Sequence, residues 1–281
     1  MRIVTNSKRA NRNLQFLRVL SGDTIILPMH LKLISLNLWW GGKLWDNIVD
    51  FLEREKPDIL ALQEVYESKE DRPEPYFKSI KKLQEALPYL TQAQFAPALQ
   101  GLSQDKIDYV QGNAVLSKFP LRQKSVHFFD VAYGTLDYEG ADFAYAPRNI
   151  QHVTADINGT DLNIFNLQGI WGKNPLDNER RMNMGKSIAE LVAGKKRTVL
   201  CGDFNVDIRT QSVAQIEEAG LVNIFKGKIN SSMNTLRRPE EIFSGIAPDM
   251  IFISPDIKLI SADCPKVDIS DHLPQIITFE I

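Results

Sequence analysis

Polar side chains of similar chemistry stand where the strand-like runs of this sequence end. Glu64, for example, comes two residues after the run Asp58–Leu62, and His272 precedes the final apolar run. The full set is Asn37, Glu64, Asp203, Asn205, Asp249, Asp271 and His272. Carboxylates, carboxamides and an imidazole suit a hard divalent cation with oxygen ligands that lies next to a phosphate. The set therefore indicates a site for metal-assisted phosphate chemistry.

Taken singly, these residues have ordinary structural explanations. A carboxylate after a strand commonly caps a helix or is solvated in a loop, and a lone histidine such as His272 is commonly a surface or hydrogen-bonded core residue. Asn37 is able to cap a turn. The recurrence at several strand ends favours a site, because strand ends and the loops beyond them hold catalytic groups on a rigid scaffold.

Apolar runs predict the strands that must position this set. Strands are expected at 32–38, 58–62, 114–116, 124–130, 150–157, 161–167, 198–201, 249–254, 257–262 and 275–281. The rest of residues 91–147 shows mainly loop chemistry. Asn158-Gly159, between two of the strands, is a strong signal for a hairpin turn.

Apolar residues at helical spacing predict helices between these strands. The first three end at Pro57, Pro88 and Gly194, which are residues that stop a helix. A fourth, short helix is expected to open with a capping box of Ser212 and Gln215. Strands that alternate with helices predict a mixed α/β domain.

Length and composition describe a globular protein. The chain has 281 residues, of which 43% are hydrophobic and 24% charged, which excludes collagen, coiled coil and wholesale disorder. No apolar stretch approaches the roughly 20 residues that cross a bilayer. The net charge of −2 gives no overall cationic bias toward nucleic acid.

The charge is uneven along the chain. Residues 1–30 hold five Lys or Arg and one acidic residue, which leaves residues 31–281 with a formal charge of −6. The first segment lacks a clear amphipathic period, so we expect a poorly ordered basic N-terminal extension at 1–30 and one domain at 31–281. Cys201 and Cys264 are too few for a disulfide framework, so a reducing compartment, the cytoplasm, is expected. We also expect the protein to be a monomer.

The ordered motifs resemble the endonuclease/exonuclease/phosphatase family, which includes the DNase I-like nucleases. These motifs are Leu36-Asn37, Leu62-Gln63-Glu64, Gly202-Asp203-Phe204-Asn205, Pro248-Asp249 and Ser270-Asp271-His272. They run in the family's order from about Lys32 to the C-terminus. The resemblance implies an α/β (α+β) four-layered sandwich, in which two facing mixed β-sheets are flanked by helices and the site lies where the sheet edges meet.

The resemblance also implies a metal site. Glu64 would be the principal ligand, with Asn37 and Asp271 near the same cation. The cation would be Mg²⁺, with Mn²⁺ as an alternative. Such an ion polarises a phosphoryl oxygen and stabilises the departing oxyanion.

The remaining motif residues are assigned catalytic roles by the same resemblance. Asp203 would orient and deprotonate the attacking water, and Asn205 would hold that water or a phosphate oxygen. His272 would donate to the phosphate, with Asp249 setting its tautomer and keeping it cationic. Arg148 matches a family position that contacts phosphate.

Gln168 departs from the family pattern. Many relatives end the strand equivalent to Asn163–Leu167 with a histidine, and others with a tyrosine, near the leaving group. A carboxamide is able to hydrogen-bond a phosphate but supplies no proton. The departure argues against a general acid here and leaves metal-assisted hydrolysis intact.

Three functions stay open at this level. The first is hydrolysis of a phosphodiester in nucleic acid or a nucleotide, although the −6 domain counts against a long nucleic-acid footprint. The second is the same chemistry on a phospholipid or small phosphate ester, and the third is a phosphate-binding relative without turnover. Trp39, Trp40 and Trp171 follow site residues and are expected to line the mouth, whereas Trp45 is expected in the core.

Overall fold

Two β-sheets form the centre of the molecule in this computed structural model, which describes residues 29–69, 74–102, 108–137 and 142–281. The first sheet has the order β12-β13-β1-β2-β4-β3-β6 and the second β10-β11-β9-β8-β7-β5. The strands of the first are β1 (Leu31–Asn37), β2 (Ile59–Glu67), β3 (Gln92–Leu102), β4 (Asp108–Ser117), β6 (Gly134–Asp137), β12 (Lys258–Asp263) and β13 (Gln275–Glu280). Those of the second are β5 (Leu121–Phe128), β7 (Asn149–Ile157), β8 (Thr160–Gln168), β9 (Thr198–Asp203), β10 (Val222–Asn223) and β11 (Asp249–Ile253).

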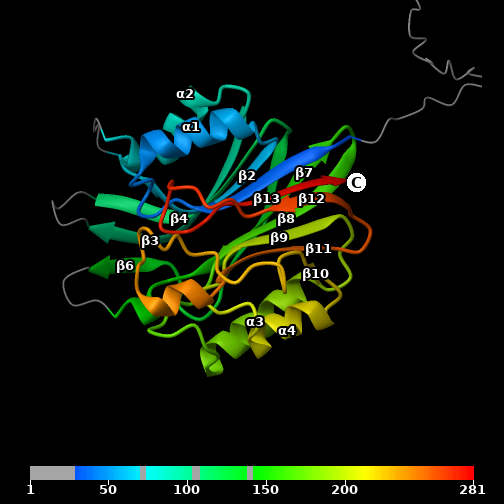
Figure 1. The fold of residues 1–281 in the computed structure, drawn as a ribbon. Helices are drawn as coiled ribbons and strands as arrows, with labels where there is room; N and C mark the ends of the chain where they lie inside the picture. Colours follow the sequence, from blue (N-terminus) through cyan, green and yellow to red (C-terminus); the bar gives the residue numbers. More distant parts are fainter. Residues whose placement is uncertain (1–28, 70–73, 103–107, 138–141) are drawn as a thin grey trace, which may run out of the picture.

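Helices cover the outer faces of both sheets (Figure 1). The pair α1 (Trp45–Glu55) and α2 (Ser79–Ala86) packs on the first sheet, where Phe51 and Leu83 join the core that contains Leu36 and Leu60. The pair α3 (Glu179–Val192) and α4 (Gln211–Glu218) packs on the second sheet. The expected four-layered sandwich of two mixed sheets flanked by helices is confirmed.

Both sheets bring the ends of parallel strands to the same edge. In the first sheet β1 runs parallel to β2, so Asn37 lies opposite Gln63. In the second sheet β8 runs parallel to β9, so Gln168 lies opposite Asp203, and the antiparallel neighbour β11 places Asp249 on the other side of Asp203. The strand ends that carry the polar motifs are therefore neighbours in the fold.

The sequence-based elements are confirmed where their apolar period is strong. The hairpin of β7 and β8 turns at Asn158 and Gly159, which both have positive φ as a tight hairpin turn requires. Within residues 91–147, the strands expected at 114–116 and 124–130 correspond to β4 and β5, whereas β3 and β6 lie where loop chemistry was expected. The strand β5 begins at Leu121 and not at residue 124, because Arg122 and Gln123 are polar and exposed and hide the start of the strand.

The predicted capping box at Ser212 is wrong. The helix α4 begins at Gln211, and Ser212 is buried inside its first turn. Asp177 accepts hydrogen bonds from the backbone N–H groups of Gln211 (2.7 Å) and Ser212 (3.3 Å). A carboxylate from a distant segment therefore supplies the cap.

Three further expectations concern the chain ends, the cysteines and membranes. Most of the predicted N-terminal extension, residues 1–28, lies outside the described residues. Cys201 and Cys264 are both free thiols. Within the described ranges, none of the helices has the length and apolar character that a membrane span requires.

Candidate active site

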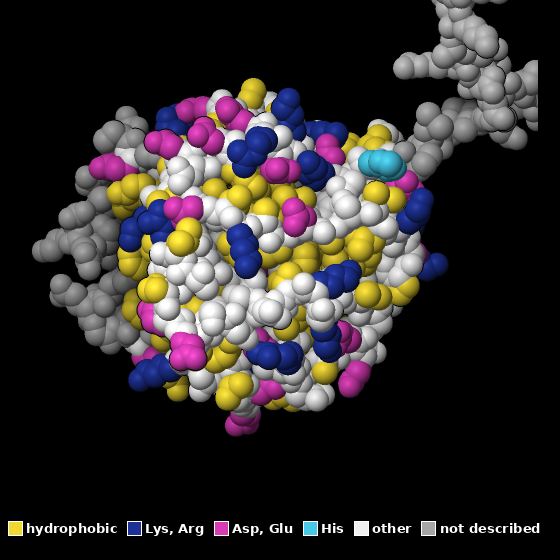
Figure 2. Space-filling view, in the orientation of Figure 1, with side chains coloured by type: hydrophobic (Ala, Val, Ile, Leu, Met, Phe, Trp, Pro, Cys, Tyr) yellow, Lys and Arg dark blue, Asp and Glu magenta, His cyan; other side chains and the backbone are white. Residues whose placement is uncertain are grey.

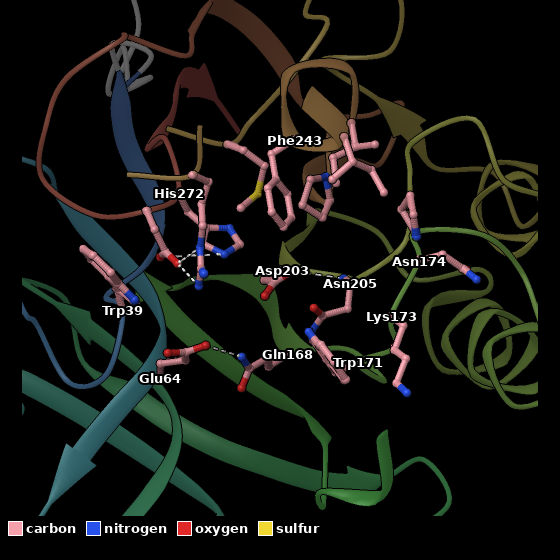
Figure 3. Close-up of a pocket in the computed structure, with 18 of the residues that line it drawn as sticks. Trp39, Glu64, Gln168, Trp171, Lys173, Asn174, Asp203, Asn205, Phe243 and His272 are labelled. Carbon is pink, nitrogen blue, oxygen red and sulfur yellow. Dashed lines mark hydrogen bonds and ion pairs between the residues drawn. The ribbon is translucent and has the colours of Figure 1, made fainter. Parts of the chain in front are cut away.

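The polar strand ends surround a cavity of about 240 Å³ at the edge where the two sheets meet (Figure 3). Seven of the nine residues expected at the site line it: Glu64, Arg148, Gln168, Asp203, Asn205, Asp271 and His272. The other two are buried directly behind the wall, where Asn37 bonds Glu64 and Asp249 bonds His272. The structure thus brings all nine together.

A β-bulge presents Glu64 to the cavity. Between Leu62 and Val65 the pairing of β2 with β4 shifts by one residue, and Glu64 adopts a positive φ of 53°. Such a bulge bends the strand and re-aims the side chain. Three donors then hold the carboxylate. Its Oε1 accepts from Nδ2 of Asn37 (3.2 Å) and Nε2 of Gln168 (2.9 Å), and its Oε2 from the backbone N–H of Trp40 (2.8 Å).

Asn37 is arranged as a donor. Its Nδ2 also donates to Oδ2 of Asp203 (3.1 Å), and its Oδ1 accepts from the backbone N–H of Trp39 (2.9 Å). The amide therefore links carboxylates of the two sheets, and its oxygen is turned toward the backbone. In this arrangement Asn37 orients Glu64 and presents no oxygen to the cavity.

Asp203 ends β9 in a fully buried position. Its Oδ1 accepts from the backbone N–H of Asn205 (2.9 Å), whose own Nδ2 donates to the carbonyl of Gly169 (3.0 Å). Burial raises the pKa of Asp203 to about 6, and the nearby carboxylates of Asp249 and Glu64 add to the rise against the opposing effect of His272. A carboxyl with this pKa is a better base near neutral pH than an ordinary aspartate.

His272 and Asp249 form a buried pair. Nδ1 of His272 lies 2.9 Å from Oδ2 and 3.1 Å from Oδ1 of Asp249, and Oγ of Ser232 donates to the same Oδ2 (2.7 Å). Burial by itself would lower the pKa of His272. The carboxylates of Asp249, Asp203 and Asp271 outweigh burial, so the pKa of His272 is raised well above its usual range. The raised pKa favours the cationic ring, and Nε2 makes no contact with Asp249.

Asp271 pairs with an arginine that sequence reasoning missed. Nε of Arg238 donates to Oδ2 of Asp271 (2.9 Å), and a terminal nitrogen of the same guanidinium lies 2.7 Å from that oxygen. Burial raises the pKa of Asp271, and the carboxylate of Glu64 adds to the rise, while His272 and Arg238 oppose it. Arg238 comes from the irregular segment between α4 and β11, where no period or motif marks a site residue.

Arg148 and Trp39 bring unpartnered donors to the cavity wall. The Arg148 side chain is buried, 6% exposed, and among the described residues its Nε and Nη1 have no hydrogen-bond partner. Nε1 of Trp39 is likewise buried without a partner in the described part of the chain. Buried donors left unsatisfied cost free energy, and an anion in the cavity would satisfy them.

The four tryptophans lie in the places that the sequence predicted, three at the cavity and one against the core. Trp39, Trp40 and Trp171 line the cavity, with Trp40 and Trp171 exposed at its mouth. Trp45 packs against the core under α1.

The donor set fits a hard divalent cation. Four carboxylates gather here, from Glu64, Asp203, Asp249 and Asp271, and burial, with a smaller effect of the neighbouring carboxylates, raises the pKa values of Asp203 and Asp271. Atoms of Asp203, Asp249 and His272 lie within 4.8 Å of one another. Both Asp249 oxygens already face the imidazole, whereas Glu64 and Asp271 line the cavity.

Comparisons with known proteins show the family and agree with the fold. The chain matches the model of the Endonuclease/Exonuclease/phosphatase family over residues 34–272. It is similar in fold to an endonuclease/exonuclease/phosphatase from Beutenbergia cavernae DSM 12333, with a TM-score of 0.71 and 17% identity over 90% of this chain and 72% of that chain.

Two further solved structures share the fold. The mannosyl-6-phosphatase Bt3783 of Bacteroides thetaiotaomicron has a TM-score of 0.63 and 20% identity over 89% of this chain and 100% of that chain. The catalytic domain of human Nocturnin, solved with a bound sulfate anion, has a TM-score of 0.60 and 20% identity over 90% of this chain and 93% of that chain. The search of curated proteins returned no match.

Proposed function

The chain belongs to the endonuclease/exonuclease/phosphatase family, and from that premise we propose that it is a divalent-metal-dependent hydrolase of phosphodiesters. The observation that carries the proposal is a cavity in which cationic and N–H donors, without partners among the described residues, lie together with a cluster of carboxylates. The donors suit an anionic substrate, and the carboxylates suit a cation and a water nucleophile.

Asp203 and Asn205 would hold the attacking water. The raised pKa of Asp203 supports its acting as the base that takes the proton of that water. Asn205 adopts a positive φ of 56°, and its backbone N–H is bonded to Asp203, so the two side chains are fixed relative to each other. Fixed positioning lowers the entropy cost of attack.

His272 and Arg148 would bind the phosphoryl oxygens. The cationic His272, held through Nδ1 by Asp249, has its Nε2 available to donate to a phosphate oxygen. Arg148 would use the buried nitrogens that have no partner among the described residues. Donors fixed before the reaction stabilise the charge that develops on the phosphate without reorganising.

Glu64 and Asp271 would hold the divalent cation, Mg²⁺ or Mn²⁺. When bound, the cation would neutralise phosphate charge and stabilise the departing oxygen. Asn37 and Gln168 would keep the Glu64 carboxylate oriented through their hydrogen bonds to Oε1. Such supporting bonds commonly set metal affinity.

A short phosphodiester, such as that of a nucleotide, is a better substrate than a long duplex. Lys, Arg, Asp and Glu side chains are interspersed on the face shown in Figure 2, without a single-sign field that would follow a nucleic-acid backbone. The formal charge of −6 on residues 31–281 points the same way. The lysine and arginine residues that line the cavity are Arg148, Lys173 and Arg238.

A substrate panel with Mg²⁺ and Mn²⁺ tests the proposal. The panel contains plasmid, abasic-site duplex, single-stranded RNA, sphingomyelin, inositol phosphates and a chromogenic phosphodiester. Glu64→Gln keeps the size of the side chain but loses the charge, so we expect it to remove most metal-dependent activity and metal affinity while the fold is retained. The matched control is Glu53→Gln, an exposed change on α1. Wild-type metal affinity and turnover in Glu64→Gln would show that the site is misassigned.

A further inference from the structure

The loop that joins β8 to α3, residues 169–178, forms one wall of the catalytic cavity. Its residues 171–175 all line that cavity, and the side chain of Lys173 is exposed at the mouth. Figure 3 shows Lys173 and Asn174 on the far side of the cavity from Glu64. The conformation of this β8–α3 loop therefore decides which groups meet a substrate on that side.

A buried arginine of α3 lies behind the β8–α3 loop. Arg181 is only 1% exposed, although its side chain is charged. Its Nε donates to the carbonyl of Ile170 (3.1 Å), and its Nη1 donates to the carbonyls of Asn174 and Leu176, each at 2.6 Å. One guanidinium therefore bonds three carbonyls that are spread over residues 170–176.

In the part of the chain that the structure describes, no carboxylate forms an ion pair with Arg181. Burial lowers its pKa, and the carboxylates of Asp177 and Asp203 oppose this effect. A buried cation that is bonded to neutral carbonyls is costly to desolvate. The guanidinium has a rigid fork of donors, so the three carbonyls are held in a narrow range of positions. What this costly group provides is a fixed conformation of the loop.

The two ends of the loop have anchors that do not involve the guanidinium. At the first end, the backbone N–H of Gly169 donates to the carbonyl of Asp203 (2.7 Å), and the Gly169 carbonyl accepts from Nδ2 of Asn205 (3.0 Å). At the other end, the backbone N–H of Asp207 donates to the carbonyl of Pro175 (2.8 Å). Loss of the guanidinium should therefore displace the stretch between these anchors and leave the water-holding pair in place.

We propose that Arg181 is a positioning residue for substrate binding, which fixes the β8–α3 loop so that Lys173 meets the anionic substrate in the cavity. Lys173 has no ion-pair partner among the described residues, so its ammonium is free to bind a phosphate. Arg181 is absent from the residues that line the cavity and acts through the loop. This inference rests on the proposed function of the site, because it requires an anionic substrate.

Steady-state kinetics with the chromogenic phosphodiester and Mg²⁺ test this role. Arg181→Met keeps a long side chain but removes the charge and the donors, so we expect KM to rise about tenfold while kcat changes less than about twofold. Arg181→Lys keeps the charge and part of the bonding, so its KM should rise only about threefold. The control is Arg122→Met, an exposed change on β5 whose partner Asp161 lies at the other end of β8. A fall in kcat at constant KM in Arg181→Met would overturn the proposal.

A double-mutant cycle separates positioning of Lys173 from a general loss of structure. Lys173→Met should by itself raise KM about tenfold, because it removes a charged donor. If Arg181 acts through Lys173, the double variant should have the same KM as Lys173→Met. A KM in the double variant that equals the product of the two single effects would overturn the proposal.

A second variant displaces the loop without changing the arginine, in case Arg181→Met does not fold. A Cβ at Gly172 would lie 2.8 Å from Nη2 of Arg181, so Gly172→Ala should push the loop away from the guanidinium. The control is Gly134→Ala, whose Cβ would meet only the carbonyl oxygen of Ala132, at 3.8 Å. A raised KM at constant kcat in Gly172→Ala supports the proposal, and an unchanged KM overturns it.

Binding of an inert diester distinguishes failure of this inference from failure of the proposed function. Dimethyl phosphate is titrated in the presence of Mg²⁺ and followed by phosphorus NMR. Binding that is about tenfold weaker in Arg181→Met and in Lys173→Met, with no further loss in the double variant, supports the inference even if no ester is hydrolysed. Equal binding by the wild type and the three variants overturns it. Absence of turnover on every ester is a failure of the proposed hydrolase function.

Discussion

At the residue scale, the site depends on side chains that hold other side chains. Glu64 adopts a left-handed backbone conformation, which costs a non-glycine residue on the order of 1 kcal/mol or more and persists only where the surroundings compensate. Its carboxylate accepts from both sheets, through Asn37 of β1 and Gln168 of β8. The position of the Glu64 oxygen atoms is therefore set before any ligand arrives.

Gln168 gives a testable case of this support. Gln168→Ala removes a donor to Oε1 of Glu64, so we expect Mn²⁺ affinity to fall roughly 10- to 100-fold with little change in melting temperature. Isothermal calorimetry measures the affinity, and Gln92→Ala, an exposed change on β3, is the control. Unchanged affinity would mean that Gln168 does not support the metal site.

Gln168→His tests the missing proton donor. General acids contribute roughly 10²- to 10⁴-fold to a rate, so the histidine variant should hydrolyse alkyl phosphodiesters faster than Gln168→Ala, with a smaller gain for aryl esters. Initial rates on a matched alkyl and aryl pair measure the effect. A gain of the same size on both esters would argue against a role in protonating the leaving group.

At the element scale, β8 and β9 approach each other closely where they enter the site. Gly202 has a φ of +140°, and a Cβ built there would lie 2.0 Å from the carbonyl oxygen of Leu167. Glycine is required for both reasons, and it immediately precedes Asp203. The alignment of Asp203 opposite Gln168 depends on this contact.

Replacement of Gly202 should therefore affect both stability and activity. We expect Gly202→Ala to lower the free energy of unfolding by at least about 2 kcal/mol, because strain and a backbone clash add. The control is Gly159→Ala in the β7–β8 turn, where φ is also positive but no atom lies within 4 Å of the added Cβ, so about 1 kcal/mol is expected. Urea unfolding compares the two. Equal losses of unfolding free energy in the two variants would indicate that backbone strain alone, without a clash, causes the effect.

The strand β7 carries a pH-dependent contribution to stability. His152 stacks on Phe165 with ring centroids 4.1 Å apart, and burial lowers its pKa, against the opposing hydrogen bond that its Nε2 donates to Oδ1 of Asn163 (2.9 Å). The unfolded chain then binds more protons than the folded one. The stability that neutral His152 supports is present above its ordinary pKa of about 6.5 and is lost as pH falls toward the lower folded value.

We therefore expect His152→Gln to flatten the dependence of stability on pH. Urea unfolding of wild type and variant at pH 7.5 and 5.5 measures it. The variant is expected to be less stable at pH 7.5, because it loses the stacked ring, and the gap should narrow at pH 5.5. A constant gap between the two proteins would contradict the pKa argument.

At the scale of the whole molecule, buried amides join the two sheets beside the site. Nε2 of Gln63 donates to Oδ1 of Asn166 (2.6 Å), and Nδ2 of Asn166 donates to the carbonyls of Leu62 and Ala114, each at 3.0 Å. Asn166 belongs to the second sheet and its partners to the first. Since the site takes residues from both sheets, these bonds preserve its geometry.

Asn166→Ala should destabilise the whole fold. It removes three buried hydrogen bonds, and the Gln63 amide keeps only its longer bond to the carbonyl of Ala61 (3.3 Å), so a loss of about 3 kcal/mol in unfolding free energy is expected. Thr154→Val is the matched control, because the buried Thr154 hydroxyl has no partner among the described residues and its removal should be close to neutral. Similar losses in the two variants would refute the bridging role.

Some features of the site are readable from the sequence alone, because they depend on local pattern. Strand ends follow from the apolar period and carry seven of the expected residues, which is why those seven lie at one cavity. The other two, Arg148 and Gln168, were expected from the family resemblance. The hairpin at Asn158-Gly159 is readable for the same reason, since two positive φ angles need these residue types.

Other features were decided only by tertiary structure. Arg238, Ser232 and Gln111 come from segments with no motif, and their roles exist only because folding brings them beside Asp271, Asp249 and Gln168. The cap of α4 by Asp177 and the bulge at Glu64 are likewise products of packing between distant segments. Local sequence fixes which residue types a strand end carries. Contacts between residues far apart in the chain decide which partners those residues meet. They therefore also decide which oxygens face a ligand.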